Sequence, residues 1–245
     1  MITNIELKKY CHTLLEVDSF KDYCPNGLQI EGKQKIQHIV SGVSINLALI
    51  EKAIKNKADA IFVHHGFFWN NEQAELVGAK RKKIALLLEN NINLFAYHLP
   101  LDAHKTLGNN IQLAKLLNIK NPKPIKNSLL WRGELDNNID DFSKEITEKL
   151  QRKPQIFSAN KNIKKIAWCS GGAQNYLFEA INLGADTYLS GEISEQTPYN
   201  ALENNINYIS AGHHATEMFG IQALATHLSN KFQITQQFIN INNPV

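Results

Sequence analysis

The sequence contains few cysteines and no arrangement that suggests pairing. Cys11, Cys24 and Cys169 are an odd number of widely spaced residues, and there is no C-x-x-C motif. A disulfide framework is therefore not expected, and the reducing cytoplasm is the expected compartment. Any of the three thiols could act as a nucleophile, but buried and unreactive cysteines are much more common, and we expect that role here.

A long apolar run is also missing. No stretch reaches the ~18–20 consecutive apolar residues that a membrane-spanning helix needs. The segment MITNIELKKYCHTLLEV at residues 1–17 carries charges among its apolar residues. It predicts an amphipathic helix capped near Thr3 or Asn4 and not a signal peptide. We therefore expect a soluble, cytoplasmic protein without a membrane partner.

Neither a strong charge of one sign nor a standard nucleotide motif is present. The formal net charge is +3, so nucleic acid stays open as a partner but has no support from the net charge. The basic run Lys80-Arg81-Lys82-Lys83 is expected to be a solvated helix face. The Gly-rich SGGAQ at 170–174 fits neither G-x-G-x-x-G nor a Walker loop, and it predicts a tight turn between strand and helix. There is no G-x-S-x-G nucleophile elbow.

An internal repeat organises the chain. The segment EKAIKNKADAIFVHH at 51–65 matches FEAINLGADTYLSGE at 178–192 in its paired Ala-Ile and Ala-Asp residues. Apolar runs that end in Ser-Gly precede both copies, and ENNIN follows both, at 89–93 and 203–207. The offset changes between blocks, which indicates loops of different length around elements that keep their order.

Each copy reads as alternating strands and helices, which is typical of a largely parallel sheet covered on both faces. We therefore predict an α/β protein of two similar, layered lobes that arose by internal duplication. The segment NPKPIKNS at 121–128 contains two prolines and predicts a link between them. The predicted lobes are 1–125 and 126–245, with packing of the C-terminal segment back on the first lobe left open.

Six of the nine histidines lie where predicted strands end. His64 and His65 end one strand, and His98 ends the next, with Asp102 and His104 just beyond it. In the second copy, one strand ends at Gly191-Glu192, and another ends at Gly212 followed by His213, His214 and Glu217. Carboxyl ends of parallel strands are where open α/β sheets gather their binding groups. We expect both lobes to present this edge to a common cleft.

These residue types predict a metal site. Imidazole nitrogens together with carboxylate oxygens are ligands for zinc, iron and manganese. His213 and Glu217 are four residues apart, so a helix would project both from the same face. Adjacent His64 and His65 suit one ligand for each of two ions, and Glu217 or Asp102 could bridge them, as in two-metal hydrolases. The alternative is a histidine-rich polar cleft without metal. Phe67, Phe68 and Trp69 could stack on a base, although packing between lobes is more common for such residues.

Several stretches resemble one known family in order along nearly the whole chain. They are YCPNGLQIEG (23–32), ADAIFVHHGFFW (58–69), YHLPLDAHKTLGNN (97–110), SGEISEQ (190–196) and SAGHHATEMFGIQAL (210–224). The sequence is similar to the GTP cyclohydrolase 1 type 2 homologues, also called NIF-three-like dinuclear-metal proteins. It resembles the short form, which lacks an extra central domain.

The resemblance implies a NIF-three-like layered fold and two divalent metal ions per subunit. Carried to matching positions, the implied ligands are His64, His65, Asp102, His213 and Glu217. It also implies a homohexamer, a ring-shaped trimer of dimers whose metal sites face its interior. His98, His104 and His214 would then lie behind the ligands or face the substrate.

The leading hypothesis is a metal-dependent hydrolase that acts on a nucleotide or a related small molecule. A metal-bound hydroxide would be the nucleophile, Glu217 or Asp102 would bridge the ions, and His98 or His214 would handle protons. No triphosphate-binding motif accompanies these residues, so GTP itself is not specified. The alternative is a non-catalytic metal-binding protein, or a ring that binds protein or nucleic acid.

Overall fold

The duplicated sequence builds two units, each around a central sheet of parallel strands. The computed structural model describes residues 1–245. One compact unit, here the first unit, comprises Met1–Gly108 and Gly220–Asn242, and the second unit comprises Asn109–Phe219 and Asn243–Val245. These units divide the chain at other positions than the predicted boundary at 125/126. Residues 109–125 group with the second unit, and 220–242 return to the first.

The sheet of the first unit has five strands in the order β13-β4-β5-β6-β2. The first four run parallel, and β2 closes the edge antiparallel to β6. The strands are β2 (Gly27–Ile30), β4 (His38–Ser44), β5 (Ala60–His65), β6 (Asn93–Ala96) and β13 (Thr235–Phe238). A separate antiparallel pair joins β1 (Ile2–Thr3) to β3 (Lys35–Ile36). Residues of β5 are almost all buried, as expected for a strand covered on both faces.

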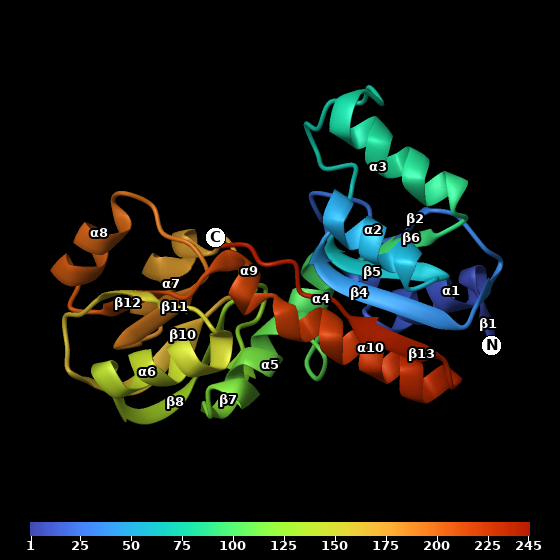
Figure 1. Ribbon diagram of the computed structural model, residues 1–245. Helices are drawn as coiled ribbons and strands as arrows, with labels where there is room; N and C mark the ends of the chain where they lie inside the picture. The colour runs from blue at the N-terminus through green and yellow to red at the C-terminus, as the bar shows by residue number, and fades with distance from the viewer. The chain divides into compact units, whose positions relative to one another are not determined.

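Helices cover both faces of this sheet (Figure 1). Alternate residues of β5 face opposite sides: Ile61 joins the core under α2 and α3, and Phe62 joins the core under α1 and α10. The helices are α1 (Asn4–Leu14), α2 (Leu47–Lys55), α3 (Gly78–Glu89) and α10 (Met218–Phe232), with a 3-10 turn η1 at Val17–Ser19. The first unit is therefore a three-layer α/β/α structure.

The N-terminal helix begins where the sequence predicts. Thr3 is the N-cap of α1: its side chain accepts the Glu6 N–H, while the Glu6 carboxylate accepts the Thr3 N–H, which completes a capping box. Leu7 and Cys11 follow at a spacing of four and are fully buried. The charged residues of 1–17 therefore lie on the outer side of an amphipathic helix.

The sheet of the second unit has six strands in the order β7-β8-β10-β11-β12-β9. Its centre repeats the first unit: β10, β11 and β12 run parallel, and β9 closes the edge antiparallel to β12. The strands are β7 (Lys120–Pro124), β8 (Trp131–Asn138), β9 (Gln155–Phe157), β10 (Asn162–Trp168), β11 (Thr187–Ser190) and β12 (Asn207–Ser210). The units differ in the neighbour on the other side of the first of these strands: β8 is antiparallel to β10, whereas β13 is parallel to β4.

This second sheet is also covered on both faces (Figure 1). Trp168 packs on the side of α5 and α6, whereas Ala167 packs on the side of α7 and α8. The helices are α5 (Asn109–Leu116), α6 (Ile139–Leu150), α7 (Leu177–Asn182) and α8 (Thr197–Glu203), with a 3-10 turn η2 at Gln174–Tyr176. Two three-layer units from one duplicated sequence are what the repeat predicts.

The proline-containing segment is a strand and not a free link. Residues Lys120–Pro124 form β7, which pairs antiparallel with β8 at the edge of the second sheet. Proline lacks an N–H, and an edge strand needs hydrogen bonds on one side only, so Pro122 and Pro124 are tolerated there. The sequence predicted a link between lobes here because proline is common both in linkers and in edge strands.

Matching hydrogen bonds hold the start of the parallel strands in both units. Asp59 precedes β5, and its carboxylate accepts the Gln37 and His38 N–H groups; Asp186 precedes β11 and accepts those of Lys164 and Lys165. Asn93 and Asn207 begin the third strand of each unit, and both are fully buried. The paired Ala-Asp and Asn of the sequence repeat are thus structural residues.

All three cysteines are free and buried. Burial raises the pKa of the Cys11 and Cys24 thiols to about 12, so both remain protonated and unreactive near neutral pH. No helix of the structure is long and apolar enough to cross a membrane.

Candidate metal centre

His64 lies at the carboxyl end of β5 and is fully buried. Its Nδ1 is 2.8 Å from the carbonyl oxygen of Tyr97. A carbonyl can only accept, so Nδ1 carries the proton and a neutral ring has its lone pair on Nε2. That Nε2 lies 3.4 Å from Oδ2 of Asp102, which is 5% exposed. Two electron pairs facing each other at this distance repel unless a proton or a metal cation lies between them.

His65 is the next residue, and its ring leaves the strand on the other side. Its Nδ1 is 2.9 Å from Oγ of Ser44, the last residue of the neighbouring strand β4. The His64 and His65 ring centroids are 4.6 Å apart. Because successive side chains of a strand alternate, the two imidazoles reach different positions, as two separate ligands would require.

His98 is the third imidazole of this group. It follows β6 as the N-cap of α4 (Leu99–Ala103), the helix that carries Asp102. One ring nitrogen from each of His64, His65 and His98 lies within 4.8 Å of the others. We call His64, His65, His98 and Asp102 the first ligand group; all four belong to the first unit.

An acidic residue before β2 orients His98. Asp22 accepts the His98 Nδ1–H at 2.7 Å and the Leu99 N–H at 3.0 Å. Asn26 donates to the same carboxylate and accepts the His98 backbone N–H. Burial alone would raise the pKa of Asp22. The hydrogen bonds from His98, Asn26 and the Tyr23 N–H outweigh burial, so the pKa lies below its ordinary value. Asp22 is therefore ionised and orients the His98 ring through Nδ1, so Nε2 is the nitrogen that remains for a ligand or a proton.

The second unit carries its own pair of candidate ligands. His213 begins the short helix α9 (His213–Thr216), and Glu217 is its C-cap. His213 Nε2 lies 3.1 Å from Oε2 of Glu217, while its Nδ1 lies 2.6 Å from Oε1 of Glu192, which follows β11. We call Glu192, His213 and Glu217 the second ligand group.

Two carboxylates make His213 strongly basic. Burial alone would lower its pKa, but the hydrogen bonds and negative charges of Glu217 and Glu192 raise the pKa to about 9. Without a metal, the imidazole is therefore a cation at neutral pH. A divalent ion would replace the Nε2 proton between the same two atoms, with Glu192 still accepting the Nδ1–H.

Glycines leave the space that Glu217 occupies. Gly171 follows β10 in the SGGAQ segment with φ +67°, a conformation that other L-residues rarely adopt. A Cβ built there would lie 2.1 Å from Glu217 Oε1. The Gly171 N–H donates a hydrogen bond to the Thr216 hydroxyl oxygen at 3.0 Å. The segment is a tight turn, as expected, and its glycine makes room for a candidate ligand.

The other two histidines of these motifs have different surroundings. His214 is buried, 8% exposed, and its backbone N–H donates to the Val245 carbonyl. His104 Nδ1 accepts the Leu107 N–H at 3.0 Å and so holds the turn after α4. Burial lowers the pKa of His104, which keeps the ring neutral for this role. His104 is therefore a structural residue.

Sequence reasoning missed Asp22 and Asn26 and did not assign Glu192 as a partner of His213. Asp22 and Asn26 are 76 and 72 residues from His98 in the chain. The stretch that begins at Tyr23 was noted only for its resemblance, and nothing in its spacing points to a histidine. The sequence places Glu192 at a strand end. In the repeat it aligns with His65, and this equivalence is the signal that could have identified it as a site residue.

Both ligand groups have the chemistry that a divalent ion requires. Each presents an imidazole Nε2 opposite a carboxylate oxygen, and in each the Nδ1 has its own acceptor. Nitrogen and oxygen donors of this kind suit zinc, iron or manganese. Cys24 lies near Asp22 and His98, and burial raises the pKa of its thiol to about 12 in the metal-free protein. The fold and these donors define a two-unit α/β protein with histidine–carboxylate groups that could hold a metal ion.

Comparison with known proteins assigns that protein to a family. The family described as Duf34/NIF3 (NGG1p interacting factor 3) matches residues 2–244. The chain therefore belongs to the Duf34/NIF3 family, which confirms the resemblance seen in the sequence.

Curated relatives match over nearly their whole length. A Pseudomonas aeruginosa protein is 45% identical over 236 residues, which is 94% of both chains. A Buchnera aphidicola protein is 46% identical, and the match covers 98% of this chain and 99% of that protein. Both are named GTP cyclohydrolase 1 type 2 homolog.

Solved structures share the fold. One, described as protein ybgI of unknown function, is 40% identical, covers 100% of both chains and has a TM-score of 0.96. A second, TTHA1606 from Thermus thermophilus, is 29% identical over 100% of both chains with a TM-score of 0.93. The NIF-three-like α/β fold is thereby established.

Proposed function

We propose that this protein is a metal-dependent hydrolase that holds two divalent ions and acts on a nucleotide or a related small molecule. The ligands are His64, His65 and Asp102 from the first unit with His213 and Glu217 from the second. The observation that carries the proposal is the repeated pairing of a histidine Nε2 with a carboxylate oxygen, at 3.4 Å for His64 and 3.1 Å for His213.

Neither ligand group alone contains enough donors for two ions. The first group offers three imidazoles and one carboxylate, and the second offers one imidazole whose other nitrogen is already bonded to Glu192. Two hydrolytic ions together use more ligands than either group has while keeping positions for water and substrate. We therefore propose that residues of both groups would hold the two ions, with Asp102 and Glu217 as the carboxylate ligands.

When bound, the ions would lower the pKa of a water molecule and offset the negative charge that develops on the substrate. The protein's own residues supply the rest. Asp22 keeps the His98 Nδ1 protonated, so His98 Nε2 can accept a proton from water and return it to the leaving group. His214 is the alternative proton carrier, and its buried position favours His98 for this role.

The relatives support the substrate class only through their name. Their name refers to GTP cyclohydrolase, and GTP accordingly enters the substrate screen. Opening a purine ring needs specific contacts to the base in addition to the ions. Nucleotides, phosphodiesters and cyclic amidines form the rest of the screen.

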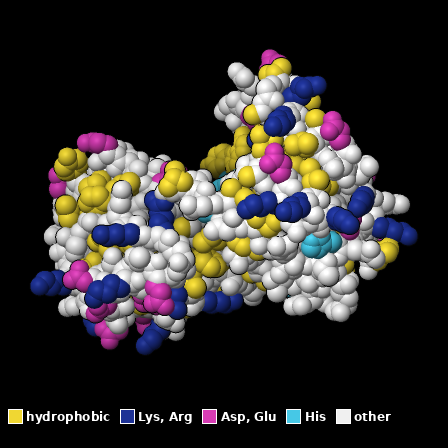
Figure 2. All heavy atoms as spheres, in the orientation of Figure 1, with side chains coloured by type: hydrophobic (Ala, Val, Ile, Leu, Met, Phe, Trp, Pro, Cys, Tyr) yellow, Lys and Arg dark blue, Asp and Glu magenta, His cyan; other side chains and the backbone are white.

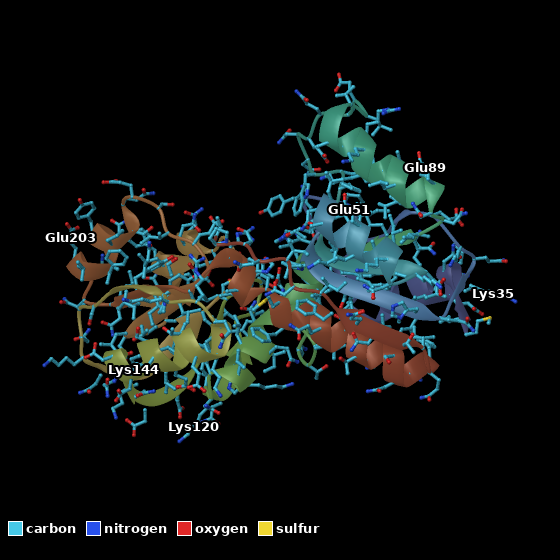
Figure 3. The ribbon with its side chains drawn as sticks, in the orientation of Figure 1. Lys35, Glu51, Glu89, Lys120, Lys144 and Glu203 are labelled. Carbon is cyan, nitrogen blue, oxygen red and sulfur yellow. The ribbon has the colours of Figure 1, made fainter.

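The test begins with elemental analysis of protein purified without added metal. We expect about two divalent ions per chain, and hydrolysis of at least one substrate with the ions found. Glu217→Ala should abolish turnover and release metal. Glu203→Ala is the matched control, because Glu203 is an exposed residue at the end of α8 that points away from its unit (Figure 3). Ions without any Glu217-dependent turnover would support the non-catalytic alternative, and absence of ions would refute the proposal.

A further inference from the structure

A cluster of aromatic rings surrounds His98 on the first unit. The Trp69 and His98 ring centroids are 4.9 Å apart in an edge-to-face arrangement, and those of Tyr23 and His98 are 6.3 Å apart. Trp69 also lies 5.8 Å from His65. Two of the histidines of the first ligand group therefore border two aromatic side chains that have no part in the hydrophobic cores.

These rings are open to solvent although they are large. Tyr23 is 61% exposed and Phe68 is 38% exposed. The other tryptophans, Trp131 and Trp168, are 2% and 0% exposed, whereas Trp69 is half-buried. Figure 2 shows hydrophobic side chains at the surface among Lys and Arg side chains around α3, the helix that follows this loop. An exposed tyrosine that lies beside candidate metal ligands marks a candidate ligand-binding surface.

Two loops are tied together to hold this arrangement. The Asn70 N–H donates to the Tyr23 carbonyl at 2.7 Å, which joins the loop before β2 to the loop after β5. Glu72 accepts the Phe68 and Trp69 N–H groups, and the Trp69 indole N–H donates to the Gly66 carbonyl. These hydrogen bonds fix the two loops to each other and hold the aromatic residues in place.

The backbone of this loop is held in an uncommon conformation. Phe68 has φ +66°, in the left-handed region that a bulky side chain rarely occupies. The two hydrogen bonds to Glu72, which is also paired with Lys80, keep it there. A loop that only connected β5 to α3 would not need an aromatic residue at such a position.

We propose that Tyr23 and Trp69 form a stacking platform for a planar heteroaromatic ring, of purine size, beside His98. Bases stack on aromatic side chains whatever their hydrogen-bonding edge, because every base presents a π-face. Tyr23, which is 61% exposed, supplies most of the accessible ring area, and Trp69 supplies a second ring next to His98. This inference rests on the proposed function in one respect only: it assigns the heterocyclic part of the substrate to the first unit.

Trp69 provides a direct measurement of binding. Since Trp131 and Trp168 are buried, a ligand that stacks in solution would quench mainly Trp69 fluorescence. Guanosine and adenosine monophosphate should both quench it with similar affinity, because stacking does not read hydrogen-bonding edges. Ribose 5-phosphate, which has the phosphate but no ring, should bind at least tenfold more weakly by calorimetry. Each titration is performed with metal-loaded and with chelator-treated protein.

Variants of Tyr23 test the assignment of residues. Tyr23→Ala should weaken binding of either nucleotide about tenfold, as loss of one stacking ring does elsewhere, and Tyr23→Phe should restore it. Tyr199→Ala is the matched control, because Tyr199 is also 61% exposed but lies on the second unit. Metal content of the Tyr23 variants should equal that of the unsubstituted protein.

Three results would overturn the inference: equal binding of ribose 5-phosphate and the nucleotides, equal effects of Tyr23→Ala and Tyr199→Ala, or no quenching. A change in sedimentation of Tyr23→Ala together with no quenching would assign the rings to a contact between copies of the chain. If the ions bind and the rings do not, the proposed function stands without this platform. If the rings bind but the purified protein holds no ions and shows no turnover, the platform stands and the metal-dependent function fails.

Discussion

The two units begin their parallel strands alike and end them differently. Asp59 and Asp186 each precede the second parallel strand, and each accepts two backbone N–H groups from the start of the first. At the other end of the same strands, His64 and His65 of the first unit align with Gly191 and Glu192 of the second. The two copies therefore share the residues that register their strands and differ at the candidate metal-ligand positions.

The difference shows what each end of a strand must do. At the start, any copy of this fold must satisfy the same buried backbone groups, and short Asp and Asn side chains do so. At the carboxyl end the backbone opens to loops and short helices, so side chains there are free to vary. Variation has left an imidazole-rich group on one unit and a carboxylate-rich group on the other.

Replacing the matched asparagines should cause the largest effect. Asn93 accepts the Gly32 N–H and donates to the Lys33 and Asp59 carbonyls, while Asn207 accepts the Ala159 and Asn160 N–H groups. Asn93→Ala and Asn207→Ala each leave buried backbone groups unsatisfied, at about 2–4 kcal/mol in the free energy of unfolding. Urea unfolding monitored by circular dichroism measures this.

Asn90→Ala is the control for these variants, because Asn90 is exposed and bonds only within the end of its own helix. Similar losses for the two buried asparagines would confirm that the strand starts are equivalent. A large loss for one variant and none for the other would show that the two strand starts are not equivalent.

A methyl group at Gly171 should disturb the second ligand group only. Gly171→Ala would place a Cβ 2.1 Å from Glu217 Oε1, so the carboxylate must move. We expect metal affinity to fall by about 10–100-fold, as for other displaced ligands. Gly184→Ala has a similar φ of +70° and no atom within 4 Å of the new Cβ, so it matches the backbone strain without the contact. Calorimetric titration of chelator-treated protein distinguishes them, and equal effects would contradict the role given to Gly171.

Metal binding should depend on pH through His213. Because its pKa is raised to about 9, a metal must displace one proton at neutral pH, and affinity should rise about tenfold per pH unit up to that pKa. In the metal-free protein the sign is opposite: stabilisation by the imidazolium is present below its ordinary pKa of 6.5 and is lost as pH rises through about 9. Titrations between pH 6 and 9 measure both. Glu192→Gln should end the dependence at a lower pH, and an unchanged profile in that variant would exclude Glu192 as the cause.

The smallest effect is expected at Asp59. Burial alone would raise its pKa, but bonds from Lys33 and from the Gln37 and His38 N–H groups lower it below the ordinary value. Its contribution is therefore present above that ordinary value and is lost as pH falls through the lowered pKa. Asp59→Asn should cost about 1 kcal/mol at pH 7 and nothing once Asp59 itself is protonated. Asp186→Asn is the partner measurement, and pH-dependent unfolding checks whether the two positions respond alike.

Local patterns account for most of the secondary structure and for the fold class. Thr3 and Glu6 mark the start of the first helix by a capping box, and the repeated Ala-Asp and Asn residues indicate that the strands come twice in the same order. They do not place the segment at 120–124, because proline favours an edge strand and a linker alike. Nor do they place α10, whose apolar residues pack on the first sheet although the helix follows the second ligand group in the chain.

The sequence by itself determined that this chain is a duplicated α/β protein with histidines and carboxylates at its strand ends. Those features depend on periodicity and on neighbours within a few residues, which a sequence displays directly. Only the tertiary structure decided which atoms face each other. Asp22 meets His98 across 76 residues, Glu192 shares His213 with Glu217, and His104 turns inward to hold a loop. Hydrogen-bond direction and burial, which set tautomers and charges, exist only once the chain is folded.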